Sequence, residues 1–178
     1  LHPLVRERVG EIERITLRCH RTLTRIMDKR GVLRNSADRD HCVQYIVAVG
    51  LLQGQIGPHD FEDVFAADPR IDALRAKMEL SEDARYTADF SDPAKRSSAN
   101  SVQVHFRDGS SSDRIEVEYP AGHARRRAEA LPMLKQKFEA SLGRRFEKGR
   151  SKRILELCED QVKLARTAVH DFVGLLRA

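Results

Sequence analysis

Three short stretches of the chain alternate apolar and polar residues with a period of two. Ile15, Leu17 and Cys19 carry the first, and the other two lie at residues 102–106 and 115–119. This period is typical of a strand with one apolar face. An Asp-Gly pair and three serines separate the last two stretches, which predicts a β-hairpin between them.

Between the first strand and the hairpin, one segment has the composition of a buried helix. Residues 42–52 are apolar on nearly every side, and Gly54 and Gly57 follow them. A helix that is apolar all round belongs in a core, and glycine is the residue that most often ends one. Ser36 is the predicted N-cap, because its hydroxyl can accept a hydrogen bond from the first free backbone N–H groups.

A second helix is predicted after residue 68. Asp68 is suited to the N-cap and Pro69 to the first helical position, since proline lacks the N–H that would go unpaired there. A short helix at residues 60–67 precedes it. Residues 79–101 are polar and irregular in pattern, which allows a short strand but predicts no helix.

From residue 123 onward the spacing is helical throughout. Three helices are predicted: Pro132 opens the first and Gly143 stops it, Ser151 caps the second, and Thr167 caps the third. The apolar residues of the first helix share one side: Leu131, Leu134, Phe138 and Leu142. Those of the other two are predicted to face inward: Ile154, Leu155, Cys158, Val162, Val169, Phe172, Val173 and Leu176.

The order of strand, helices, hairpin and helices predicts an α+β fold, because a doubly wound sheet would alternate strands and helices regularly. We expect an α+β domain with a β-hairpin at residues 1–122. A three-helix C-terminal segment is expected at residues 123–178.

Composition narrows the class of protein. The 178 residues carry a net charge of +5, with acidic and basic residues interspersed along most of the chain. Charge alone does not separate nucleic acid, anionic lipid and small anions as partners. Cys19, Cys42 and Cys158 are far apart, which indicates a reducing compartment and favours neither a disulfide framework nor a metal site. We also expect no signal peptide and no transmembrane segment.

The densest polar cluster lies at residues 34–45, where the buried helix begins. Asp38, His41 and Tyr45 are spaced i, i+3 and i+7, so one continuous helix would place them on one face. One interpretation is a carboxylate that orients a histidine for acid–base chemistry beside a helix N-terminus that favours anions. The alternative is structural: Asp38 caps, His41 is a satisfied buried histidine, and Tyr45 bonds to a neighbouring loop.

A second cluster joins the hairpin to the helical segment at residues 119–127. It contains Gly122, His123 and three consecutive arginines from Arg125. Arginine presents a planar fork that matches a carboxylate or phosphate with two parallel hydrogen bonds. The cluster therefore predicts a carboxylate clamp at a domain junction, with a solvated basic loop or a nucleic-acid contact as the alternatives.

Four phrases carry a resemblance to a known family. They are residues 34–45 (RNSADRDHCVQY), 65–75 (FAADPRIDALR), 92–100 (DPAKRSSAN) and 118–127 (EYPAGHARRR). In the same order, they resemble the C-terminal part of enzymes of the MmgE/PrpD family, and within it the dehydratase branch. The resemblance covers essentially the whole chain.

The resemblance implies an architecture. Members of the family have a large helical domain, built from the N-terminal part and a returning C-terminal segment, and a smaller α+β domain that acts as a lid. It implies that residues 1–122 are most of the lid. Residues 123–178 then belong with a helical domain that is absent from this chain. It also implies a homodimer without cofactors, in the cytoplasm or, in a eukaryote, the mitochondrial matrix.

The implied activity is the dehydration of 2-methylcitrate to 2-methyl-cis-aconitate in propionate catabolism, with this chain inactive by itself. Within the matching phrases, we expect His41 and His123 to serve proton transfer. Arg39, Arg125 and Arg126 are expected to bind the carboxylates of a small tricarboxylate substrate. Neither a nucleic acid nor a membrane is expected as a partner on this interpretation. The alternative is a stand-alone small-anion or nucleic-acid-binding module that reuses the lid fold.

Overall fold

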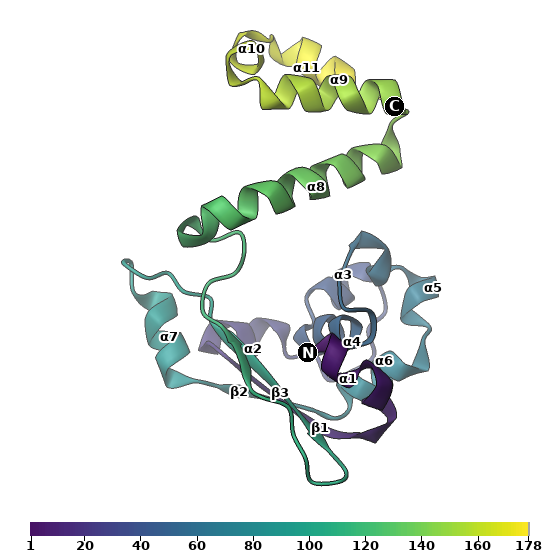
Figure 1. Ribbon diagram of the computed structural model, residues 1–178, viewed down its shortest axis with the longest axis vertical. Coiled ribbons are helices and arrows are strands. Elements are labelled where there is room, and N and C mark those ends of the chain that lie inside the picture. The colour runs from purple at the N-terminus through teal and green to yellow at the C-terminus, as the bar shows by residue number, and fades with distance from the viewer. Residues whose placement is uncertain (178) are drawn as a thin grey trace. The chain divides into compact units, whose positions relative to one another are not determined.

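A computed structural model describes residues 1–177, and the chain divides into two compact units. The first unit is Leu1–Pro120, and the second begins at Ala121 (Figure 1). The first contains a sheet and the second contains helices, so the α+β fold with a helical C-terminal segment is confirmed. The domain boundary predicted after residue 122 stays a prediction.

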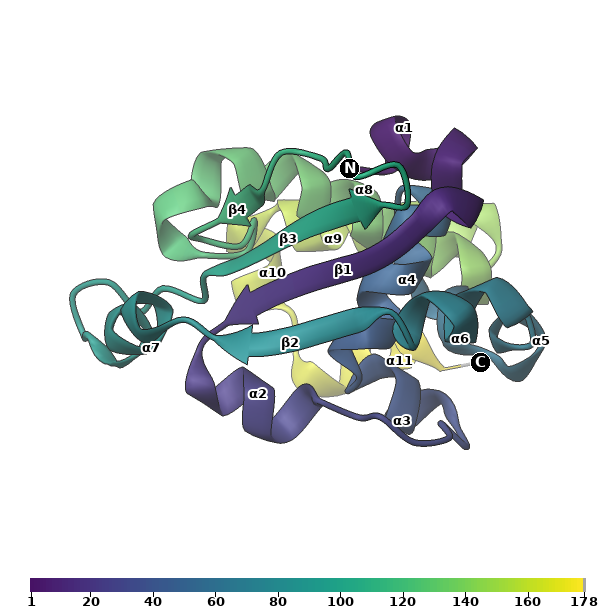
Figure 2. The ribbon, with the colours of Figure 1, turned by 90° about the horizontal axis from the view of Figure 1, so that it is seen from below.

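The first unit is built on a four-stranded mixed sheet with the order β2-β1-β3-β4 (Figure 2). The strands are β1 (Ile12–Cys19), β2 (Met78–Glu82), β3 (Asn100–Phe106) and β4 (Ile115–Val117). Strand β1 pairs parallel to β2 and antiparallel to β3, and β3 pairs antiparallel to β4. The predicted first strand and the predicted hairpin are therefore confirmed. The apolar face of the hairpin is only partly covered, since Ile115 and Val117 are exposed.

Two helices pack against one face of this sheet and share a core with it. They are α4 (Val43–Gln53) and α6 (Pro69–Arg75). The core contains Ile15, Leu17 and Val104 from the strands, Tyr45, Ala48, Val49 and Leu51 from α4, and Ile71 and Leu74 from α6. Burying each large apolar side chain contributes about 1.5–3 kcal/mol. The buried helix is confirmed, and Gly54 ends it in the left-handed conformation at φ 76°.

Shorter helices complete the first unit: α1 (His2–Val5), η1 (Arg6–Glu11), α2 (Arg21–Met27), α3 (Ser36–Asp40), η2 (Pro58–Phe61), α5 (Asp63–Ala66) and α7 (Ala84–Ser91). Asp68 caps α6 through the N–H of Arg70, as predicted. The prediction for Ser36 was wrong, because Asn35 is the N-cap and accepts the N–H of Asp38. Helix α7 occupies a stretch in which no helix was predicted.

The second unit contains η3 (Ala124–Arg126), α8 (Arg127–Arg145), α9 (Lys148–Glu159), α10 (Gln161–Arg166) and α11 (Val169–Leu176). Its described part thus has four α-helices where three were predicted. Helix α8 begins five residues before Pro132 and continues through Gly143. Glu147 caps α9 through two backbone N–H groups, so the cap predicted at Ser151 was wrong. Ala168, not Thr167, precedes α11.

The core of the second unit is small. Ala130, Leu142, Ile154 and Leu157 are buried. Seven other large apolar side chains of this unit are exposed: Leu131, Met133, Leu134, Val162, Val169, Val173 and Leu176. Six of the seven lie on α8 or α11, and Val162 lies on α10. The inward placement predicted for Val162, Val169, Val173 and Leu176 was wrong, because nothing among the described residues covers them.

Candidate functional site

The polar cluster at residues 34–45 does not lie on one continuous helix. Helix α3 ends at Asp40, α4 begins at Val43, and Cys42 between them has an extended backbone with φ −122° and ψ 108°. The spacing of Asp38, His41 and Tyr45 therefore does not place them on one face, and that prediction was wrong. The buried Cys42 thiol at this break donates to the carbonyl of Lys29.

Each of the three side chains has its own partner. Asp38 accepts hydrogen bonds from the N–H of Arg34 and from Lys29 Nζ, at 3.1 and 3.2 Å, and these bonds lower the pKa of Asp38. The Tyr45 hydroxyl donates to the carbonyl of Asp60, and burial raises the pKa of Tyr45. The His41 ring is exposed and contacts the carboxylate of its neighbour Asp40. Asp40, rather than Asp38, is thus the carboxylate beside His41.

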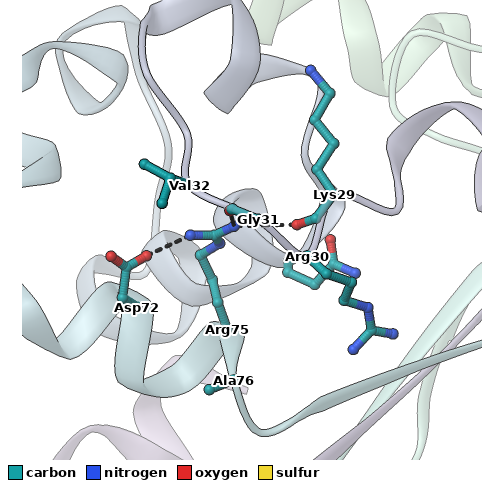
Figure 3. Close-up of a pocket in the computed structure, with 8 residues that line it drawn as sticks. Lys29, Arg30, Gly31, Val32, Asp72, Arg75 and Ala76 are labelled. Atoms are coloured by element: carbon teal, nitrogen blue, oxygen red, sulfur yellow. Dashed lines mark hydrogen bonds and ion pairs between the residues drawn. The ribbon is translucent and has the colours of Figure 1, made fainter.

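Two cavities lie beside this cluster and share Val32, Asp72 and Arg75. The larger has a volume of about 500 Å³ and is lined by Lys29, Arg30, Gly31, Val32, Gln44, Asp72, Arg75 and Ala76 (Figure 3). The smaller has a volume of about 250 Å³ and is lined by Val32, Leu33, Arg39, Tyr45, Asp63, Ala66, Ala67, Asp72 and Arg75. The shared residues make this face of the first unit the candidate site.

Arg75 stands between the two cavities. Its side chain is 10% exposed, and Nη1 pairs with Asp72 one helical turn earlier. Nη2 donates to the carbonyls of Lys29 and Gly31, at 3.1 and 2.9 Å. Figure 3 shows the guanidinium reaching across to this loop from α6. Nε is buried without a hydrogen-bond partner, so one donor of this arginine is unsatisfied.

Arg39 is the second buried arginine of the site. Its side chain is 7% exposed, and Nη1 donates to the carbonyl of Phe61 at 2.6 Å and pairs with Asp63 at 2.7 Å. A guanidinium stays charged when it is buried, so it needs acceptors. The structure thus places Arg39, but not His41, among the residues that line the described cavities.

The other cations of the larger cavity are paired on its rim. Lys29 pairs with Asp38 at 3.2 Å, and Arg30 pairs with Asp28 at 2.7 Å. In Figure 3 the amine of Lys29 and the guanidinium of Arg30 both point away from Arg75. The site therefore presents the two buried arginines to its interior. Such a site suits a small anion with carboxylate groups better than a long polyanion.

The remaining candidates lie in the second unit. His123 precedes η3, and its Nδ1 accepts the N–H of Arg125 at 3.2 Å. Arg126 pairs with Glu129 at 2.7 Å. Because Arg39 and His41 belong to the first unit, the five candidate residues do not form one cluster within a single unit.

The described residues give little support to a thiol nucleophile or a metal centre. Burial raises the pKa of the Cys19 thiol to about 11, so this thiol stays protonated near neutral pH and is a poor nucleophile. Among residues 1–177, no three histidine, cysteine or acidic side chains gather as a metal-binding set. In the same part of the chain, none of the helices has the length and apolar character needed to cross a bilayer.

Arg75 was not among the residues predicted for the site, although its position on the helix indicates that it is buried. Arg75 follows Ile71 by four residues and therefore points to the same side of α6 as that buried isoleucine. A charged residue at an inward helical position needs buried partners. Those partners, the carbonyls of Lys29 and Gly31, are more than forty residues away in the chain.

The family model and the curated relatives that match this chain all point to one family. The family model described as the MmgE/PrpD C-terminal domain matches residues 1–161. The chain is 47% identical over 166 residues to the 2-methylcitrate dehydratase of Salmonella typhimurium and 46% identical over 166 residues to that of Escherichia coli. Each match covers 93% of this chain and 34% of the relative. The mitochondrial 2-methylcitrate dehydratase of Yarrowia lipolytica is 46% identical over 145 residues, covering 82% and 28%. The chain spans about a third of the length of these curated relatives.

Proposed function

The chain belongs to the MmgE/PrpD family through that family's C-terminal domain, and from this premise we propose that it is the C-terminal portion of a hydro-lyase. The proposed reaction is the dehydration of 2-methylcitrate to 2-methyl-cis-aconitate. The observation that carries the proposal is the similarity to 2-methylcitrate dehydratases over 93% of this chain. The similarity favours this function over a stand-alone binding module.

The cavity at Arg39 supports the proposal chemically. Dehydration of a tricarboxylate requires a base for the carbon-bound proton, an acid for the departing hydroxide, and cations that hold the carboxylates and the charge that develops. Arg39 is a buried guanidinium that lines a cavity, which suits the last role. We assign proton transfer to His41 and His123, and the remaining carboxylate contacts to Arg125 and Arg126.

The other properties implied by the family are proposals of the same kind. We propose a homodimer that works without a metal or organic cofactor in propionate catabolism. The proposed location is the cytoplasm, or the mitochondrial matrix in a eukaryote. The relatives' additional length would supply the N-terminal helical domain and, with it, further catalytic groups.

A hybrid enzyme tests the proposed activity. This chain replaces the corresponding third of the Escherichia coli relative, and the folded hybrid is assayed with 2-methylcitrate by the absorbance of the conjugated alkene product. We expect turnover within about tenfold of the intact relative, because the two sequences are 46% identical over the exchanged part. A hybrid that folds and dimerises but does not dehydrate 2-methylcitrate would contradict the proposal.

The arginine cluster of the second unit has a separate test in the same hybrid. Arg125→Lys and Arg126→Lys keep the charge but remove the bidentate fork. If either arginine holds a substrate carboxylate, its lysine variant is expected to lose about tenfold to a hundredfold in kcat/KM. Lys137→Arg, on α8, is the control for exchange between the two cations. Unchanged kinetics in both arginine variants would return the cluster to a solvated basic loop.

A further inference from the structure

The ion pair between Arg39 and Asp63 is unequal in burial. The Arg39 side chain is 7% exposed, whereas the Asp63 side chain is 84% exposed. Both residues line the smaller cavity together with Tyr45. The cation thus belongs to the wall of the cavity, and the carboxylate reaches it from the solvent side.

The energetics of such a pair are also unequal. A guanidinium taken out of water gains from an anionic partner, because burial removes part of its hydration. The exposed carboxylate gains little from the pair, since it gives up good hydration for one contact. Arg39 therefore requires a carboxylate, but the structure does not require that carboxylate to be Asp63.

The Asp63 carboxylate can also move away from Arg39 without disturbing a long helix. It is the first residue of the four-residue helix α5, and Glu62 is the residue before that helix. If the Asp63 carboxylate turns to solvent, Arg39 keeps its hydrogen bond to the carbonyl of Phe61. The guanidinium would stay in position while one of its acceptors is exchanged.

The second arginine of the same cavity repeats the arrangement. The Arg75 side chain is 10% exposed and pairs with Asp72, which is 75% exposed. Arg75 retains two backbone carbonyls as acceptors, whereas Arg39 has one. Arg39 is therefore the guanidinium that depends more on its carboxylate partner and is better suited to exchange it.

We infer that Asp63 is an internal carboxylate that occupies Arg39 in the empty site and is displaced by a carboxylate of a small di- or tricarboxylate ligand. The inference rests on the proposed function for the ligand class, and it adds a competitor within the protein. The ligand's carboxylate replaces that of Asp63 on Arg39, so the guanidinium keeps one anionic partner throughout the exchange. Binding strength then reflects the difference between two carboxylates on one arginine.

Removing the charge of Asp63 tests the inference. Asp63→Asn keeps the size of the side chain but takes away the competing charge. Calorimetry with citrate and with 2-methylcitrate is expected to show binding about two- to fivefold tighter than in the unchanged chain, the scale of an exposed ion pair. Arg39→Ala in the same background is expected to weaken binding at least about tenfold. Glu7→Gln, which removes an equally exposed carboxylate from the exposed Arg6, should change nothing.

Three outcomes would contradict the inference. If Asp63→Asn binds citrate more weakly, Asp63 orients Arg39 for the ligand and the exchange is overturned. If affinity is unchanged, or if inorganic phosphate binds as tightly as citrate, the site has no internal competitor or no carboxylate preference, and the inference also fails. The dehydration assay of the hybrid enzyme tests the proposed function separately. Its result does not depend on whether Asp63→Asn strengthens or weakens citrate binding.

Discussion

The chain by itself is expected to dehydrate 2-methylcitrate at least about a thousandfold more slowly than the hybrid enzyme. General acid–base catalysis alone contributes about a hundredfold to ten-thousandfold, and only when the acid and base are held against the substrate. Within the first unit, Arg39 lines a cavity while His41 is exposed beside Asp40. A substrate carboxylate can bind at such a site, but no base is placed there to remove the proton from the carbon beside that carboxylate.

The surface of the second unit supports the same expectation. Leu131, Met133 and Leu134 are exposed on α8, and Val169 and Val173 on α11. Apolar side chains exposed in this number are typical of a surface that packs against another part of a protein. The curated relatives are about three times as long as the match to this chain, so they contain the additional length that such packing would need.

The comparison requires a folded chain. Circular dichroism and a cooperative urea transition establish that condition, and the conjugated alkene absorbance then gives the rate for the chain and for the hybrid at equal concentration. Turnover of the chain within tenfold of the hybrid would show that all catalytic groups lie within these residues. His41 and His123 would then be the first positions to replace.

Local patterns were reliable where short-range geometry decides the structure. The alternation at Ile15, Leu17 and Cys19 became the central strand β1, because period two puts all three on the core face of the sheet. Asp68 and Pro69 began α6, because a cap and a fixed φ act within one turn. Both inferences depend on contacts between residues a few positions apart.

Long-range contacts decided what the pattern could not predict. The fully buried Tyr86 of helix α7 donates its hydroxyl to Glu116 at 2.6 Å, and Glu116 lies thirty residues later in the chain. Cys42, where the helix breaks, likewise contacts Lys29, thirteen residues earlier. The sequence therefore identified Arg39 as a candidate but could not assemble its cavity, since Asp63 and Arg75 reach it from separate helices.

Replacing Arg75 by leucine is expected to cost about 2–3 kcal/mol of unfolding free energy. The variant loses charge-assisted hydrogen bonds to two buried carbonyls, at Lys29 and Gly31. Hydrogen bonds to charged groups each contribute about 1.5–3 kcal/mol. The full sum is not expected, because leucine also relieves the unsatisfied Nε and buries apolar surface in its place.

Arg70 provides the matched control on the same helix. It also pairs with an aspartate, Asp68, two residues earlier, but its side chain is exposed and it donates to no distant carbonyl that the structure describes. Arg70→Leu is expected to leave the urea midpoint within error, since exposed ion pairs contribute little. Arg75→Leu should lower the midpoint at constant slope and speed amide exchange at residues 29–33. Equal midpoints for the two variants would show that Arg75 does not fasten the loop to α6, and the wall shared by the two cavities would then need another support.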